Sequence, residues 1–184
     1  QTHCIDFGDL VSMPVRLLES DAGVLASIQG AYDHVLVDEY QDVNRSSIRL
    51  LEAICPTGEN LWVVGDAKQS IYRFRGASSF NTARFGKRDF PGGARGRLKR
   101  NYRSSKEVVD AFSAFATQMK VSNGDTGLDA DRGAVGAPVE LHAVRQGDEQ
   151  VVAIAEAIEA MRAGGYKYRD QAVLCTGNER LSSI

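Results

Sequence analysis

The sequence contains no long hydrophobic run, few cysteines and no leader pattern. No apolar stretch approaches the roughly 20 residues that a helix needs to span a bilayer, and the chain does not open with a basic segment followed by an apolar one. We therefore expect a cytoplasmic protein without a membrane partner. The three cysteines form no CxxC pair and stand far apart, at Cys4, Cys55 and Cys175. This spacing argues against a disulfide framework or a zinc site, and we interpret all three as structural residues.

The composition is that of a globular protein. Of the 184 residues, 43% are hydrophobic and 25% are charged, which suffices for the core of one domain or of two small ones. The same fractions exclude disordered and collagen-like chains. The chain begins at Gln1 without an initiator methionine and ends shortly after a strand-like segment. We therefore expect it to be an internal piece of a longer protein.

The charge is distributed unevenly along the chain. The net charge is only -2, yet residues 66–106 contain 12 Lys or Arg residues against two acids, a local charge of +10, and the rest of the chain carries -12. The segment also contains six aromatic residues, Tyr72, Phe74, Phe80, Phe85, Phe90 and Tyr102. A solvated basic face is the ordinary explanation of such a run. Because rings are interspersed with the charges, the pattern favours a surface that binds nucleic acid or a nucleotide.

Two short β-branched runs predict the fold class. Residues 34–37 read as a strand buried on both faces and end in Asp38 and Glu39, and residues 61–64 read as a second buried strand that ends in a polar turn. Between them, apolar residues recur at helical spacing after Asn44, a good helix cap. Strand, helix and strand in this order are typical of an open parallel α/β sheet, which binds ligands beyond the carboxyl ends of its strands.

The remaining patterns predict further helices and a long loop. Residues 5–19 have helical spacing, although Pro14 should kink or divide that helix. Ser104 and Glu107 form a capping box before another helix. The polar, Gly-rich stretch 122–138 is typical of a mobile loop.

Regular patterns return after this loop. Residues 139–143 alternate as in a strand, and residues 151–161 have helical spacing before a Gly-Gly stop. Residues 172–175 read as another buried strand.

The acidic pair that follows the first strand is a candidate for nucleotide hydrolysis. Such chemistry needs one carboxylate that holds Mg²⁺ and a neighbour that positions or deprotonates the attacking water. Asp38 and Glu39 fit these two roles. A pair of acids at a strand end is more often only the solvated start of a loop, so the pair is not sufficient evidence by itself.

Residues 63–77 add a second candidate region. Gln69 could sense a phosphate oxygen or a bound water, and it precedes alternating aromatic and basic residues. In an extended segment Tyr72 and Phe74 would share one side, with Arg73 and Arg75 on the other. This arrangement suits bases that stack on one side and phosphates that bind on the other, whereas packing in a core is the alternative for the two rings.

The third candidate is the pair that precedes the capped helix. Arg103 could neutralise charge that develops on a γ-phosphate, and Tyr102 could stack on adenine. A salt bridge and a core ring are the alternative readings.

Taken together, three segments resemble motifs II, III and IV of the UvrD/Rep-like DNA helicases of superfamily 1. They read DEYQD at 38–42, GDAKQSIYRFRGA at 65–77 and NYRS at 101–104. The resemblance implies a partial RecA-like parallel-sheet motor domain followed by the beginning of a second one. It places the C-terminal part of the first domain at residues 1–97 and the N-terminal part of the second at residues 98–184.

The resemblance also implies cofactors and roles at the nucleotide. The cofactors are ATP and Mg²⁺. By similarity, Asp38 would bind the Mg²⁺ of MgATP, Glu39 would be the catalytic base for water attack, and Gln69 would link the γ-phosphate to the DNA groove. Arg103 would be an arginine finger that reaches the nucleotide from the second domain, and Tyr102 would stack on adenine.

The same resemblance implies single-stranded DNA and single-strand/duplex junctions as partners. Tyr72 and Phe74 fall where aromatic residues of the family stack on bases, and the family often has Trp at the position of Phe74. Arg73 and Arg75 belong to the same motif and count with the DNA-binding residues. The other partners would be the remaining helicase domains of the parent chain and, through an unpaired sheet edge, a second copy.

The phosphate loop of the family and its later motifs, including the second arginine, are absent from the sequence. No GxxxxGK[ST] phosphate loop occurs in the 184 residues, so the β- and γ-phosphates would lack its backbone NH groups and its lysine. We therefore expect an ATP-dependent helicase in the parent protein and negligible ATPase activity in this chain alone. The alternative is a noncatalytic helicase-like module that binds DNA or another partner. A metal-dependent nuclease at Asp38 and Glu39 is a third reading, although the further acids or Lys that such a site needs are missing at suitable spacing.

Overall fold

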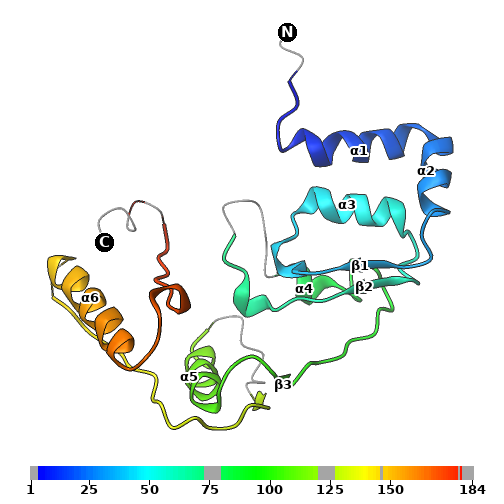
Figure 1. Ribbon diagram of the computed structural model, residues 1–184. Coiled ribbons are helices and arrows are strands. Elements are labelled where there is room, and N and C mark those ends of the chain that lie inside the picture. The colour runs from blue at the N-terminus through cyan, green and yellow to red at the C-terminus, as the bar shows by residue number, and fades with distance from the viewer. Residues whose placement is uncertain (1–3, 73–79, 120–126, 146, 178, 180–184) are drawn as a thin grey trace. The chain divides into compact units, whose positions relative to one another are not determined.

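The computed structural model describes residues 4–72, 80–119, 127–145, 147–177 and 179. The chain divides into two compact units, residues 1–136 and 137–184. Each unit is described by itself below, and Figure 1 shows the elements of both.

The first unit contains the predicted parallel strands, but the prediction that both faces are buried is wrong, because Leu36 is 77% and Trp62 64% exposed. β1 (Val35–Val37) and β2 (Leu61–Val63) pair in parallel, with Leu36 opposite Trp62. Between them the chain forms α3 (Arg45–Ile54), which Asn44 caps by accepting the Ser47 N–H at 2.9 Å. The α/β class with parallel strands is thereby confirmed, and it is the class of the RecA-like motor domains.

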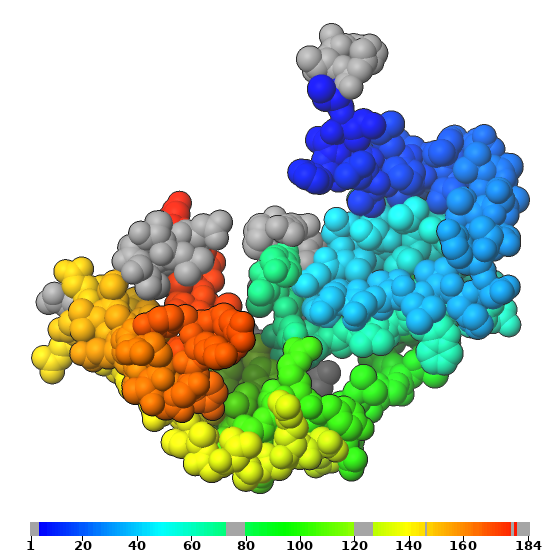
Figure 2. Space-filling model, viewed as in Figure 1, coloured from blue at the N-terminus to red at the C-terminus, as the bar shows by residue number. Residues whose placement is uncertain are grey.

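Three helices pack together beside these strands. α1 (Asp9–Ser20) and α2 (Ala22–Gln29) pack against α3, and in the view of Figure 1 α3 lies between α1 and the strands, while Figure 2 shows the same part of the chain in space-filling form. The core of this helical group includes Val15, Leu18 and Ile48, all buried. Burial of such side chains contributes about 1.5–3 kcal/mol each relative to exposure.

The predicted division of the first helix at Pro14 does not occur. α1 continues through Pro14. The chain breaks instead at Asp21, whose carboxylate accepts the backbone N–H groups of Gly23 at 2.9 Å and Val24 at 3.0 Å. An acceptor side chain at this position satisfies the free N–H groups that begin α2.

Short elements follow each strand. A 3-10 turn, η1 (Tyr40–Asp42), comes after β1, and a second, η2 (Ala67–Gln69), comes after β2. α4 (Phe80–Arg84) contacts η1, and Phe85 then bridges to Asp89.

A second parallel pair lies further along the first unit. β3 (Arg100–Asn101) pairs with β4 (Asp129–Ala130), and α5 (Lys106–Ala116) lies between them in the chain. β4 falls within the predicted loop 122–138, of which residues 122–126 lie outside the described residues.

The capping box predicted before α5 does not form. The helix begins after Ser105, and Glu107 accepts the backbone N–H groups of Val135 at 2.9 Å and Gly136 at 2.7 Å. Hydrogen bonds from its own backbone N–H and from Gly136 hold the pKa of Glu107 below its usual value. The glutamate therefore fastens a distant loop in addition to its contacts at the helix start.

The second unit consists of α6 (Gly147–Ala163) and a 3-10 turn, η4 (Tyr168–Asp170). The strands predicted at 139–143 and 172–175 are not formed, and Leu141 and Leu174 are exposed. A strand needs a neighbour for its N–H and C=O groups, and the described residues of this unit include no strand to serve as one. None of the described helices combines the length and the apolar character needed to cross a bilayer.

Candidate functional site

The candidate site lies at the carboxyl ends of β1 and β2. Asp38 and Glu39 directly follow β1. Asp66 lies three residues after the end of β2, beyond Val64 and Gly65. The pairing of the two strands extends past the ladder, because Val64 N–H donates to Val37 O and Tyr40 N–H donates to Val64 O, both at 2.9 Å. The two polar turns are therefore held side by side.

The acidic pair is exposed and has an unusual backbone. Asp38 Oδ1 accepts the N–H of Glu39 at 2.8 Å, and both side chains face solvent. Glu39 has a φ of 50°, in the left-handed region that non-glycine residues seldom adopt. Such strain persists only where surrounding contacts determine it, and it is concentrated at functional sites.

Gln41 supplies those contacts. Its side chain is only 1% exposed. Nε2 donates to Glu39 Oε2 at 2.5 Å, and Oε1 accepts the backbone N–H of Asp66 at 2.8 Å. One buried amide therefore links the acidic pair after β1 to the turn after β2.

Gly65 leaves the space that this amide occupies. A Cβ at Gly65 would lie 2.7 Å from Gln41 Oε1 and 3.1 Å from the backbone nitrogens of Gln41 and Tyr40. Contacts this close do not occur without displacement of the neighbour. A glycine is required here by the close approach of Gln41.

Gln69 belongs to the same network. Asp66 Oδ1 accepts the N–H of Lys68 at 2.9 Å, and Asp66 Oδ2 accepts from Gln69 Nε2 at 3.1 Å. Ser70 Oγ donates to the carbonyl oxygen of Gln41 at 3.2 Å. The structure thus brings three of the predicted residues, Asp38, Glu39 and Gln69, to one edge of the sheet.

Tyr102 and Arg103 lie in a different loop, directly after β3. Asn101 Oδ1 accepts the backbone N–H groups of Arg103 at 3.0 Å and Ser104 at 2.8 Å, and Arg132 Nη1 donates to the Arg103 carbonyl at 2.7 Å. Both predicted side chains are exposed beside a shallow depression that residues 101–104 line. The reading of Tyr102 as a core ring is therefore wrong.

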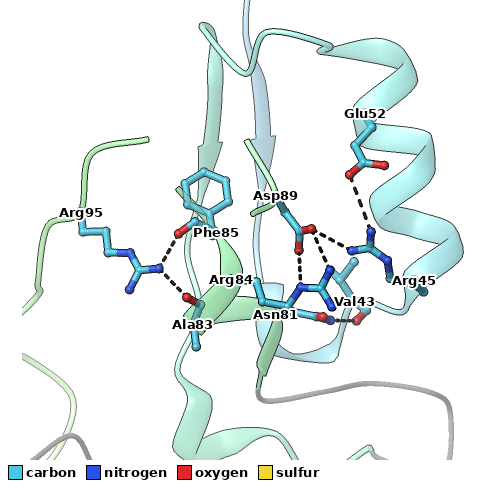
Figure 3. Close-up of polar contacts among 9 residues, drawn as sticks. All are labelled: Val43, Arg45, Glu52, Asn81, Ala83, Arg84, Phe85, Asp89 and Arg95. Carbon is cyan, nitrogen blue, oxygen red and sulfur yellow. Dashed lines mark hydrogen bonds and ion pairs between the residues drawn. The ribbon is translucent and has the colours of Figure 1, made fainter. Parts of the chain in front are cut away.

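A cluster of ion pairs around the buried Asp89 stabilises the segment that follows the acidic pair (Figure 3). Asp89 is 1% exposed, and its Oδ1 lies 3.0 Å from Arg45 Nη1 and 3.3 Å from Arg84 Nη2. Asn81 Nδ2 donates to the carbonyl oxygen of Val43 at 2.5 Å. The segment around α4 is thus fixed against the chain that follows the acidic pair.

Tyr40 packs at the centre of this support. Its side chain is fully buried, and its ring meets that of Phe85 edge to face with centroids 5.6 Å apart. Burial, reinforced by the negative charge of Asp89, raises the pKa of Tyr40 to about 12. Its hydroxyl has no hydrogen-bond partner among the described residues.

The donor set fits a magnesium ion that a nucleotide brings with it. Mg²⁺ is usually bound by one or two carboxylates together with phosphates and waters. Asp38 offers one exposed carboxylate with an oxygen, Oδ2, that the neighbouring N–H does not use. Within the part of the chain that the structure describes, no three potential ligands gather as they would for a metal held by protein alone.

The other predicted DNA-binding residues are only partly described. Tyr72 is exposed and follows η2 by three residues. Arg73, Phe74 and Arg75 lie outside the described residues.

Sequence reasoning gave no role to two residues that organise these loops. The role of Asn101 could have been predicted, because an Asn side chain commonly accepts hydrogen bonds from the backbone N–H groups two and three residues later. The role of Gln41 could not, because its hydrogen bond from the Asp66 N–H spans 25 residues and depends on the pairing of β1 with β2.

Comparison with known proteins gives consistent matches along the chain. The UvrD/REP helicase N-terminal domain matches residues 1–91, and the UvrD-like helicase C-terminal domain matches residues 97–184. The ATP-dependent DNA helicase PcrA of Leuconostoc citreum is 39% identical over 114 residues, which are 62% of this chain and 15% of that protein. PcrA of Bacillus subtilis (strain 168) is 40% identical over 111 residues, 60% of this chain and 15% of the relative.

A longer alignment covers almost the whole chain. PcrA of Staphylococcus aureus (strain Mu50 / ATCC 700699) is 33% identical over 181 residues, 97% of this chain. These residues are 24% of the relative. The chain therefore spans a quarter or less of the length of the relatives it matches.

Proposed function

Because the chain belongs to the UvrD/Rep-like helicases of superfamily 1, we propose that it is part of an ATP-dependent DNA helicase. The parent protein would couple hydrolysis of MgATP to movement on single-stranded DNA and to unwinding of duplexes. In this proposal residues 1–97 belong to the first motor domain and residues 98–184 begin the second. The names of the relatives, which are ATP-dependent DNA helicases, support the choice of nucleotide and nucleic acid.

The observation that carries the proposal is the hydrogen-bond network of Gln41. It joins the acidic pair to the turn that holds Gln69, through bonds of 2.5 Å to Glu39 and 2.8 Å to Asp66. A site for hydrolysis needs a fixed base beside a group that can sense the phosphate. The network supplies both on one scaffold.

Each acidic residue then has a distinct task. Asp38 would hold Mg²⁺, since its Oδ2 does not accept the neighbouring N–H. The ion would neutralise charge on the phosphates of ATP. Gln41 holds Glu39 Oε2, which leaves Oε1 to accept a proton from the attacking water. Gln69 would contact the γ-phosphate or that water.

The remaining predicted residues complete the proposal. Tyr102 would stack on adenine and Arg103 would stabilise charge on the γ-phosphate, and both are exposed as these roles require. Tyr72 would stack on bases of single-stranded DNA together with Phe74, and Arg73 and Arg75 would contact the phosphates.

The chain by itself is proposed to lack ATPase activity. Its sequence contains no GxxxxGK[ST] phosphate loop, and that loop supplies backbone N–H groups and a lysine to the β- and γ-phosphates.

The test is a paired substitution in the complete protein that contains this chain. Glu39→Gln removes the proposed base but keeps a side chain of the same size. We expect it to retain MgATP binding and to lower DNA-stimulated kcat by roughly 10²- to 10⁴-fold. Glu59→Gln is the matched control, because it makes the same change at an exposed carboxylate near the amino end of β2. Ordinary turnover in the Glu39 variant would remove that residue from the chemistry, and a wild-type protein without ATPase would favour a noncatalytic module.

A further inference from the structure

A stretch of 14 residues after α4 presents a largely cationic surface, in which Arg100 is paired with Asp131 at 3.4 Å. Residues 87–100, called the basic loop here, contain six exposed cationic side chains, Lys87, Arg88, Arg95, Arg97, Lys99 and Arg100. The loop contains one acid, Asp89. The structure shows that this acid does not contribute to the surface.

Asp89 is turned into the protein and neutralised there. Its side chain is 1% exposed and lies between Arg45, from α3, and Arg84, from α4 (Figure 3). A carboxylate so paired does not offset the charges that face solvent. The sequence alone overstates the negative charge that a ligand of this loop would meet.

The beginning of the basic loop is held in one conformation. The backbone N–H groups of Lys87, Arg88 and Asp89 all donate to the carbonyl oxygen of Arg84, at 3.0, 2.9 and 3.2 Å. Arg95 Nη2 donates to the carbonyl oxygens of Ala83, at 2.8 Å, and Phe85. Cations on a preordered turn cost less conformational entropy when they bind a ligand.

The basic loop exposes cationic side chains but no aromatic ones. This difference bears on whether its ligand is single-stranded or duplex nucleic acid. Proteins that hold single-stranded nucleic acid combine cations with aromatic side chains on which bases stack. The only ring in the basic loop is Phe90, which is 5% exposed. A surface of cations and glycines suits phosphates whose bases are already paired, and a Cβ at Gly92 or Gly96 would meet no atom within 4 Å.

We propose that the basic loop binds the sugar-phosphate backbone of duplex DNA. The inference rests on the proposed function only for the class of partner, since the charge, the burial of Asp89 and the absence of exposed rings from residues 87–100 are independent of ATP. Lys87 and Arg88 make two of the phosphate contacts.

The test is a salt titration of the 184-residue chain with a short blunt duplex and with an oligothymidine of the same length. Each phosphate contact contributes about 0.9 to the slope of log K against log salt for duplex DNA. The double variant Lys87→Gln/Arg88→Gln should therefore reduce the duplex slope by about 1.8. The control Arg16→Gln/Lys167→Gln removes the same charge from two other exposed positions and should leave the slope unchanged.

Three results would overturn the proposal. They are a duplex slope that the double variant does not change, an equal loss in the Arg16/Lys167 control, and a loss confined to oligothymidine, which would mark a single-strand site. Absence of duplex binding by the wild-type chain at low salt would count equally against it. Because the Glu39 experiment measures hydrolysis, its failure would leave the result of this titration unaffected, and the reverse holds too.

Discussion

The contact between Gly65 and Gln41 predicts a large effect of adding one methyl group. An alanine Cβ at position 65 would lie 2.7 Å from Gln41 Oε1, where ordinary contacts begin at 3.4 Å. The amide would have to move by about 0.7 Å, which would stretch and weaken its hydrogen bonds to Asp66 N and Glu39 Oε2, now 2.8 and 2.5 Å.

The cost follows from the weakening of those bonds. Complete loss of its acceptor would cost a part-buried backbone N–H about 1–3 kcal/mol, which sets the upper bound, whereas Glu39 is exposed and regains water. The change of glycine to alanine returns about 0.4–1 kcal/mol by restricting the unfolded chain. We therefore expect Gly65→Ala to lower the free energy of unfolding by about 1–2 kcal/mol.

Urea unfolding monitored by far-ultraviolet circular dichroism measures this loss. The single tryptophan, Trp62, lies in β2 but is 64% exposed in the folded chain, so its fluorescence would change little on unfolding. For an m-value in the common range, the midpoint should fall by roughly 1 M. Gly96→Ala is the matched control, because its Cβ would enter open space, and it should be neutral or slightly stabilising.

A double-mutant cycle isolates the cause. If the clash with the amide is responsible, Gly65→Ala should cost less in a Gln41→Ala background, where only the 3.1 Å approaches to the backbone nitrogens of Tyr40 and residue 41 remain. The reasoning would be refuted if Gly65→Ala and Gly96→Ala unfolded at the same urea concentration, or if the cost of Gly65→Ala were the same in both backgrounds.

Two further predictions concern the support behind the site. Tyr40→Phe removes a buried hydroxyl that has no partner among the described residues, so it should be neutral or stabilising near pH 7. Since the pKa of Tyr40 is raised from 10.0 to about 12, wild-type stability should be unaffected by this group below pH 10 and fall by about 1.4 kcal/mol per pH unit between 10 and 12. Unfolding curves at several pH values should show that the free energy of unfolding falls less steeply with pH in the Phe variant than in the wild type. Equal slopes in the two proteins would contradict the assignment of this pH dependence to Tyr40. Asp89→Asn should lower the free energy of unfolding by about 1–3 kcal/mol, because it unpairs two arginines that are partly exposed. Asp131→Asn, at an exposed pair with Arg100, should cost under about 1 kcal/mol, and equal losses would mean that burial of Asp89 is unimportant.

The sheet at the site could be predicted from local pattern alone. The runs that form β1 and β2 are β-branched and end in polar turns, so both strands and the position of Asp38 and Glu39 follow from the sequence. The predicted strands at 139–143 and 172–175 have a similar local pattern, yet neither forms. Local pattern does not show whether a strand finds a neighbour, and pairing decides the outcome.

Contacts between distant segments escaped sequence reasoning. Asp89 stands in a basic run and reads as a surface acid, whereas the structure buries it against Arg45, 44 residues earlier. The role of Gln41 likewise depends on the register of β1 with β2. Both are properties of the assembled unit.

The Gln41 amide also limits which substitutions this site can accept. The side chain at position 41 must donate on one side, to Glu39, and accept on the other, from Asp66 N–H. A glutamate could accept but would set a second negative charge against Glu39, and a lysine could donate but has no acceptor. A Cβ at position 65 would crowd this amide at 2.7 Å and the backbone nitrogens of Tyr40 and Gln41 at 3.1 Å. Mutational change at positions 41 and 65 is therefore coupled, and growth at position 65 disturbs the bond that orients Glu39.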